Sequence, residues 1–91
     1  EALAIGLVNE VWPLAELKGA AQKLAEALAQ MPSKAVQSML GVLVNSSDRS
    51  LEDLLTAERA AVLANRGTAD SREGMAAFLE KRKPVFNQQT E

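Results

Sequence analysis

Hydrophobic residues recur along most of this chain at the three- and four-residue spacing of an amphipathic helix. Within residues 14–31 the apolar positions are separated by three, four, three, four and three residues, which places them on one helical face. These positions are Leu14, Leu17, Ala21, Leu24, Leu28 and Met31. The charged residues between them fall on the opposite side, so the pattern predicts a helix with one apolar face.

Two further helices are predicted between residues 33 and 65. Pro32 interrupts the first pattern, and Ser33 supplies a hydroxyl that can cap the next helix. Its predicted inward residues are Val36, Met39, Leu40 and Leu43. After a polar turn at 45–48, Ser50 followed by Asp53 resembles a capping box and starts a helix that runs to about residue 65, with Gly67 as its expected terminating residue. Its predicted apolar stripe, interrupted by Glu58, is Leu51, Leu54, Leu55, Ala61 and Val62.

A fourth helix is predicted to begin at Asp70, with Glu73 three residues later. Its predicted apolar edge consists of Met75, Phe78 and Leu79. The basic residues 81–83 are expected in its last turn, where the helix dipole favours positive charge, and Pro84 ends it. The links between these helices are short, which is typical of helices that are neighbours in space.

The two ends of the chain differ from this helical middle. Residues 1–6 are helix formers closed by Gly6, and residues 7–12 read as a short extended segment that ends at Pro13. The chain starts without Met and within this helix-like run, so we expect it to be part of a longer protein. Residues 87–91 are polar, and we expect them to form a flexible tail.

Composition excludes most catalytic chemistry. The 91 residues contain no Cys, His or Tyr, so disulfides, thiolate or histidine catalysis and Cys/His zinc sites cannot form. The net charge of -2 argues against a nucleic-acid partner, and no apolar run approaches the roughly 20 residues of a membrane helix. We therefore expect a small all-α protein without nucleic-acid or membrane partners, located in the cytoplasm, or in the mitochondrial matrix of a eukaryote.

No group of residues forms a catalytic or metal-binding motif by itself. Adjacent Glu52 and Asp53 point different ways on a helix and fit first-turn charges. Glu58 is either a buried acid with a raised pKa or a residue at the edge of its stripe. The basic run at 81–83 could bind an anion or could be a solvated helix end. We predict no catalytic residue and no metal ligand.

Two segments in the right order resemble a known family. Residues 2–11, read as Ala-Leu-Ala-Ile-Gly-Leu-Val-Asn-Glu-Val, together with Pro13 and the Met-Pro-Ser-Lys-Ala of residues 31–35, resemble the stretch that follows the catalytic core of the enoyl-CoA hydratase/isomerase (crotonase) family. Residues 70–86, with Glu-Gly, an apolar-Phe pair and Glu-Lys-Arg-Lys-Pro before a final Phe, resemble that family's C-terminal signature. The resemblance spans almost the whole chain.

The resemblance implies the C-terminal helical domain of an enzyme whose catalytic core is α/β. Residues 1–12 would then be the end of that core, residues 13–86 a helical assembly domain, and residues 87–91 the tail. Because the oxyanion hole and the acidic catalytic residues of the family lie upstream, this chain is expected to be inactive by itself. Family members assemble as trimers or dimers of trimers through this region, so the resemblance also implies a homo-oligomer.

The resemblance further implies contact with coenzyme A as part of an acyl-CoA substrate, with no tightly bound cofactor. The positions that match the family's adenine and phosphate contacts are Phe78 and Lys81. Phe78 could equally be a core anchor, since it shares its apolar edge with Met75 and Leu79. A free-standing helical interaction module is the main alternative function, and an acyl-carrier-like four-helix domain ranks last.

Overall fold

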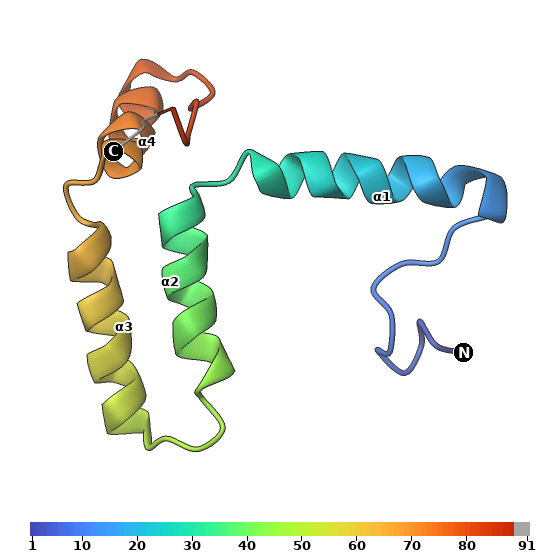
Figure 1. The fold of residues 1–91 in the computed structure, drawn as a ribbon, viewed down its shortest axis with the longest axis horizontal. Coiled ribbons are helices and arrows are strands. Elements are labelled where there is room, and N and C mark those ends of the chain that lie inside the picture. The colour runs from blue at the N-terminus through green and yellow to red at the C-terminus, as the bar shows by residue number, and fades with distance from the viewer. Residues whose placement is uncertain (89–91) are drawn as a thin grey trace.

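Four helices account for most of the described residues (Figure 1). The computed structural model describes residues 1–88. The helices are α1 (Leu14–Ala29), α2 (Ser33–Val44), α3 (Leu51–Asn65) and α4 (Ala69–Glu80), and no strand occurs within residues 1–88. The predicted all-α architecture is therefore confirmed, although α1 ends two residues earlier than the apolar spacing suggests.

The helices are not gathered around a common centre. α2 and α3 run antiparallel and side by side, and Asn65 of α3 donates from Nδ2 to Ser38 Oγ of α2 at 2.8 Å. α4 lies at the end of this pair where α2 begins and α3 ends (Figure 1). α1 projects away from the other three helices, and the N-terminal segment hangs from its far end. The α2–α3 pair is thus the one extensive helix-helix contact in residues 1–88.

The helices start where local capping chemistry allows, but two of the three predicted capping residues are wrong. Ser50 caps α3 as predicted, because its Oγ accepts the Asp53 N–H at 3.1 Å. α4 is capped by Thr68 rather than Asp70: the Thr68 hydroxyl oxygen accepts the Ser71 N–H at 3.2 Å and donates to the Asn65 carbonyl at 2.9 Å. Ser33 is the first residue of α2 and provides no side-chain cap. The α4 prediction was wrong because Thr68 already has the extended backbone that a capping residue needs.

The end of α4 also differs from the prediction. The helix ends at Glu80, so residues 81–83 lie beyond its last turn. Lys81 has a φ of +56°, the Lys81 N–H donates to the Phe78 carbonyl at 3.3 Å, and the Arg82 N–H donates to the Ala77 carbonyl at 3.0 Å. This is the hydrogen-bond pattern of a Schellman motif, which reverses the chain direction. The basic residues therefore begin a segment that returns along α4.

The chain ends were predicted in part. Residues 2–6 form hydrogen-bonded turns that close in the manner of a helix end: the Gly6 N–H donates to the Leu3 carbonyl at 3.2 Å, the Leu7 N–H donates to the Ala2 carbonyl at 2.9 Å, and Gly6 has the expected positive φ of +76°. Asn87 was predicted to be frayed, but its N–H donates to Asp70 Oδ1 at 2.9 Å and its side chain bonds the α1–α2 link. The rest of the predicted flexible tail, residues 89–91, lies outside the described residues.

The apolar faces of the helices are largely uncovered. Ala77 is the one hydrophobic residue within the described chain that is buried, at 1% exposure. Most residues predicted to point inward are exposed, including Met39, Leu40, Leu43, Leu51, Leu55, Val62, Met75 and Leu79. The partly buried residues of α2 and α3 are mostly smaller: Val36, Ser38, Val42, Leu54, Ala57, Ala61 and Asn65. Val36, Leu54 and Ala61 were among the predicted inward residues, so the helices meet along only part of the apolar faces that the periodicity located.

Gly74 offers a test of how α4 packs. A Cβ added there would meet the Phe86 ring at 3.5 Å, an ordinary van der Waals contact, and glycine weakens a helix interior relative to alanine. We expect Gly74→Ala to raise the free energy of unfolding by about 0.5 to 1 kcal/mol, measured by urea denaturation followed by circular dichroism.

Gly67→Ala is the matched control. Gly67 has a φ of +81°, so the same added methyl group should lower the free energy of unfolding by about 1 to 2 kcal/mol. A destabilising Gly74→Ala would mean that Phe86 tolerates no added atom and that α4 needs glycine for close packing.

Candidate functional site

The two residues predicted to contact coenzyme A lie at the C-terminal end of α4. Phe78 is 79% exposed, and its neighbours Met75 and Leu79 on the predicted apolar edge are exposed as well. Phe78 is therefore not a core anchor within residues 1–88. Lys81, just beyond the helix, is exposed, and its ammonium has no hydrogen-bond or ion-pair partner within the described chain. Both side chains are free to meet another molecule.

The three basic residues of the run at 81–83 have separate roles. Arg82 donates to Glu73 from Nη1 at 2.6 Å and from Nη2 at 3.0 Å, and its Nε donates to Glu80 Oε2 at 2.5 Å. Lys83 Nζ donates to Gln30 Oε1, at the end of α1, at 3.2 Å. Gln30 is a neutral amide, so Lys83 keeps its positive charge, and Lys81 is the one of the three without a partner within the described chain. The structure thus removes Arg82, which is paired with two carboxylates, from the predicted anion-binding capacity of this run.

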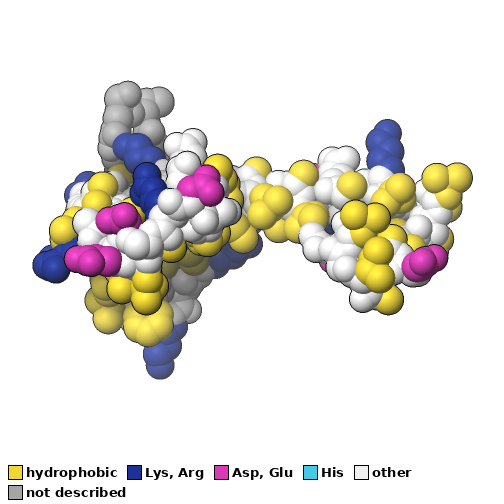
Figure 2. Space-filling model, turned by 90° about the horizontal axis from the view of Figure 1, so that it is seen from below, with side chains coloured by type: hydrophobic (Ala, Val, Ile, Leu, Met, Phe, Trp, Pro, Cys, Tyr) yellow, Lys and Arg dark blue, Asp and Glu magenta, His cyan; other side chains and the backbone are white. Residues whose placement is uncertain are grey.

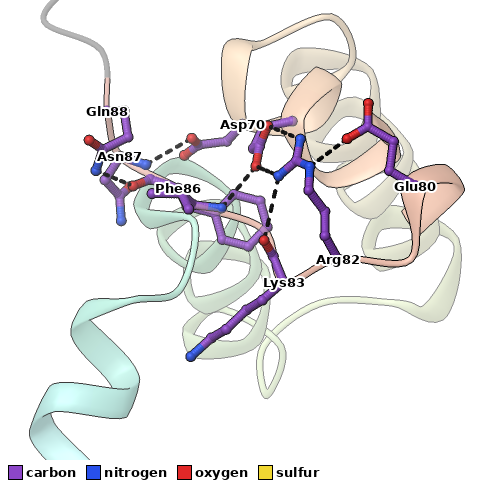
Figure 3. Close-up of polar contacts among 9 residues, drawn as sticks. Asp70, Glu80, Arg82, Lys83, Phe86, Asn87 and Gln88 are labelled. Atoms are coloured by element: carbon purple, nitrogen blue, oxygen red, sulfur yellow. Dashed lines mark hydrogen bonds and ion pairs between the residues drawn. The ribbon is translucent and has the colours of Figure 1, made fainter. Parts of the chain in front are cut away.

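The segment after Lys81 folds back along α4, and we call residues 82–87 the strap. Figure 3 shows the Arg82 guanidinium between two carboxylates, one of them Glu80. The other is Glu73, which also accepts the Val85 N–H at 2.9 Å. The Arg82 hydrogen bonds, the Val85 N–H and the Arg82 charge together lower the pKa of Glu73 from 4.5 to about 2. The hydrogen bonds to Glu73 and to Glu80, together with the charges of these two carboxylates, raise the pKa of Arg82 above its ordinary value.

The far half of the strap is held by packing and by a second acidic residue. The Phe86 ring lies against Gly74 and is half-buried, and the Asn87 N–H donates to Asp70 Oδ1 at 2.9 Å (Figure 3). Glu73 and Asp70 project from the first two turns of α4, so one helix anchors both halves of the strap. This anchoring fixes where the chain leaves α4 and hence where Lys81 sits.

A groove of about 960 Å³ lies between α2, α3, α4 and the strap. Its apolar lining includes Met39, Val42, Leu43, Val62, Met75 and Phe86. Glu58 also contributes to its wall but is exposed, so it is an edge residue of the α3 stripe and not the buried acid that the sequence left open. Figure 2 shows hydrophobic side chains spread over both lobes of the face it presents.

Three structurally important residues were not singled out as such from the sequence. Thr68 could have been found, because its hydroxyl precedes Ser71 by the spacing of a capping residue. Glu73 was noted only as part of a capping pattern, and its pairing with Arg82 nine residues later follows no helical spacing rule. Asn87 carries no local signal, since its partners are 17 to 58 residues away.

Two properties of the described chain narrow the chemistry of the site. Residues 1–88 contain no cluster of three or more side chains able to hold a metal ion. None of the helices in that range is both long and apolar enough to cross a membrane. What the site offers is an exposed aromatic ring and a free ammonium at one end of α4, beside large uncovered apolar surfaces.

The contact between the strap and α4 should depend on pH, because it involves the carboxylate of Glu73. The folded pKa of about 2 is below the ordinary value of 4.5, so this carboxylate stabilises the docked strap above pH 4.5 and the stabilisation is lost as the pH falls toward 2. We expect the Val85 amide resonance in NMR spectra to titrate with a midpoint near pH 2. Glu73→Gln should shift this resonance at neutral pH, whereas Glu80→Gln, which removes only the second partner of Arg82, should leave it in place. A midpoint near 4.5 would show that Glu73 is not paired in solution.

The sequence profile of a family described as enoyl-CoA hydratase/isomerase matches residues 1–89 of this chain. A probable mitochondrial enoyl-CoA hydratase of Dictyostelium discoideum is 39% identical over 88 residues, which are 96% of this chain and 31% of that protein. A putative enoyl-CoA hydratase of Thermus thermophilus is 38% identical over 89 residues, covering 94% of this chain and 34% of that protein.

Solved structures agree with the sequence comparison. The crystal structure of an enoyl-CoA hydratase from Bacillus anthracis superposes with a TM-score of 0.86 at 32% identity, over 97% of this chain and 34% of the other. An enoyl-CoA hydratase from Geobacillus kaustophilus gives a TM-score of 0.85 at 33% identity, over 97% of this chain and 33% of the other. The chain thus spans about a third of the length of these crotonase-fold relatives. With the match to the family covering nearly every residue, the chain belongs to the enoyl-CoA hydratase/isomerase family.

Proposed function

We propose that this chain acts as the C-terminal helical region of an acyl-CoA enzyme, where it provides assembly surfaces and part of the coenzyme A site. The observation that carries the proposal is the uncovered apolar surface: large hydrophobic side chains on all four helices face outward, while Ala77 is the one buried hydrophobic residue of the described chain. Apolar patches of this extent on a soluble protein mark surfaces that contact other protein. In this proposal they contact a catalytic core and neighbouring subunits.

Helix α1 is the clearest of these surfaces. Its leucine stripe is open to solvent, and the helix makes no extensive contact with α2, α3 or α4 within residues 1–88. The exposed fractions are 89% for Leu14, 48% for Leu17, 56% for Leu24 and 54% for Leu28. An isolated helix with such a stripe gains most of its stability from packing against something else. We assign that role to a copy of this region or to the core of the same enzyme.

The coenzyme A role is supported by the chemistry of Phe78 and Lys81. An exposed aromatic ring can stack on an adenine, and a free ammonium can bind a phosphate as a point charge. These two residues offer both types of contact from one end of α4. The thioester end of the substrate would lie elsewhere, because the resemblance places the family's oxyanion hole and acidic catalytic residues upstream of the region that this chain matches. We therefore expect the chain alone to hydrate no enoyl-CoA.

The acyl-carrier alternative gains no support. α4 does open with an Asp-Ser pair at residues 70–71, but the match of residues 1–89 to the enoyl-CoA hydratase/isomerase family favours the proposal above. The free-standing interaction module differs from the proposal in its assembly behaviour, which can be measured.

The chain should self-associate in solution, because its exposed leucine stripe and groove have no partner within residues 1–88. We expect sedimentation velocity to show dimers or larger species and a hydrophobic dye to bind. Leu24→Asp combined with Leu28→Asp should shift the distribution toward monomer, while Lys18→Asp combined with Lys23→Asp on the polar face should not. A monomer at high concentration that binds no dye would support the free-standing module instead.

Lys81 should affect coenzyme A binding in a full-length enzyme that contains this chain. One exposed charge contact contributes about 0.2 to 1 kcal/mol, so Lys81→Ala should raise KM by a few-fold. The phosphate is remote from the reacting carbons, and the contact is equal in ground and transition states, so kcat should be nearly unchanged.

A pantetheine thioester that lacks the nucleotide is the discriminating substrate. Its steady-state kinetics should be the same in the wild type and in Lys81→Ala, and Lys83→Ala should serve as the control for a lysine that is already bonded to Gln30. Equal losses with both substrates would show that Lys81 acts through folding or subunit packing and not through coenzyme A.

A further inference from the structure

The side chain of Asn87 sits at the joint between α1 and α2. Its Oδ1 accepts the N–H of Ser33, the first residue of α2, at 3.0 Å. Its Nδ2 donates to the Met31 carbonyl at 2.7 Å and to the Ala29 carbonyl, the last of α1, at 3.5 Å. Its backbone N–H is bonded to Asp70 of α4. One residue therefore joins three helices.

These bonds satisfy helix-end groups that have no partner in their own helix. Pro32 precedes α2 and offers no side-chain cap, so the Ser33 N–H would otherwise be left to solvent. The Asn87 amide oxygen takes the place of a capping side chain from 54 residues away. The side-chain amide nitrogen likewise donates hydrogen bonds to two carbonyls at the end of α1 and in the link after it. Asn87 has the donor and the acceptor that this joint requires.

Little else fixes the direction of α1. The link between α1 and α2 is residues 30–32, and α1 packs extensively against none of the other helices of the described chain. A second polar contact at this joint joins Lys83 Nζ to Gln30 and also comes from the strap. The angle between α1 and α2 thus depends on a short link and on contacts that include two strap side chains.

We propose that the strap locks α1 in a fixed direction relative to α2, α3 and α4, with Asn87 as the positioning residue of the lock. The strap is itself held on α4 through Glu73, Asp70 and Gly74, so it transmits the position of α4 to the end of α1. The consequence is that the leucine stripe of α1 is offered to a partner at a defined angle. The inference is independent of any coenzyme A role.

The backbone of Asn87 explains why this residue type suits the position. Its φ is +61°, in the left-handed region that asparagine tolerates better than most residues. Glycine would adopt this conformation as easily but has no amide to bond both helix ends. Asn87→Gly therefore removes the contacts without straining the backbone, and Asn87→Asp keeps an acceptor for the Ser33 N–H while losing the donor.

Spin-label distance measurements can test the lock. The chain has no Cys, so cysteines introduced at Lys23 of α1 and Arg59 of α3 would be its only labelling sites. Labelled chain is diluted with unlabelled chain so that pairs between molecules do not contribute. We expect a single narrow distance peak in the otherwise unchanged protein, loss of that peak in Asn87→Gly, and retention of it in Gln88→Ala, whose side chain donates to the Phe86 carbonyl of the strap.

Two further measurements separate the lock from general unfolding. A second label pair, at Gln37 of α2 and Arg59 of α3, should give the same narrow peak in wild type and Asn87→Gly. Hydrogen exchange at the Ser33 amide should be faster in Asn87→Gly and remain slow in Asn87→Asp. A narrow α1–α3 peak in Asn87→Gly would overturn the proposal, and so would broadening of both label pairs, because Asn87 would then support the whole fold and not the joint.

Discussion

The helices of this chain bury little of one another's surface, and this constraint determines most of its other properties. The partly buried residues of α2 and α3 are small or medium-sized, among them Ser38, Leu54 and Ala61, and α4 buries Ala77 instead of its Phe and Leu residues. Small residues let helix backbones come close but remove little apolar area from water. The large side chains are left facing outward. The fold therefore presents hydrophobic surface, which supports the proposal that other protein covers it.

The reversal of the chain after α4 is the second determinant. Because Lys81 adopts a left-handed conformation, Arg82 turns back toward the helix and reaches the carboxylate of Glu73. That carboxylate accepts N–H groups from both Arg82 and Val85, and its pKa falls to about 2 as a result. The pairing removes Arg82 from the basic run as a free charge. The turn that directs the strap back along α4 thus also leaves Lys81 exposed.

The sequence predicted well what depends on neighbouring residues. The four helices, the Ser50 cap and the terminating Gly67 all follow from signals within a few positions of one another. The inward faces were predicted poorly, because periodicity identifies an apolar stripe but not whether the same chain covers it. The Arg82 contact with Glu73 and the contacts of Asn87 join residues that no spacing rule relates. The matched positions Phe78 and Lys81 were located by resemblance, and the structure adds that both are exposed.

An outward-facing helix is useful for specific association only if its direction is fixed before the partner arrives. A freely swinging α1 would have to lose that freedom on binding, and each ordered group subtracts from the free energy of association. The bonds of Asn87 and Lys83 to the end of α1 remove this freedom within the chain itself. They come from the strap, which the carboxylates of α4 hold in place. In the proposed arrangement, the strap thereby sets the direction in which α1 would meet other protein.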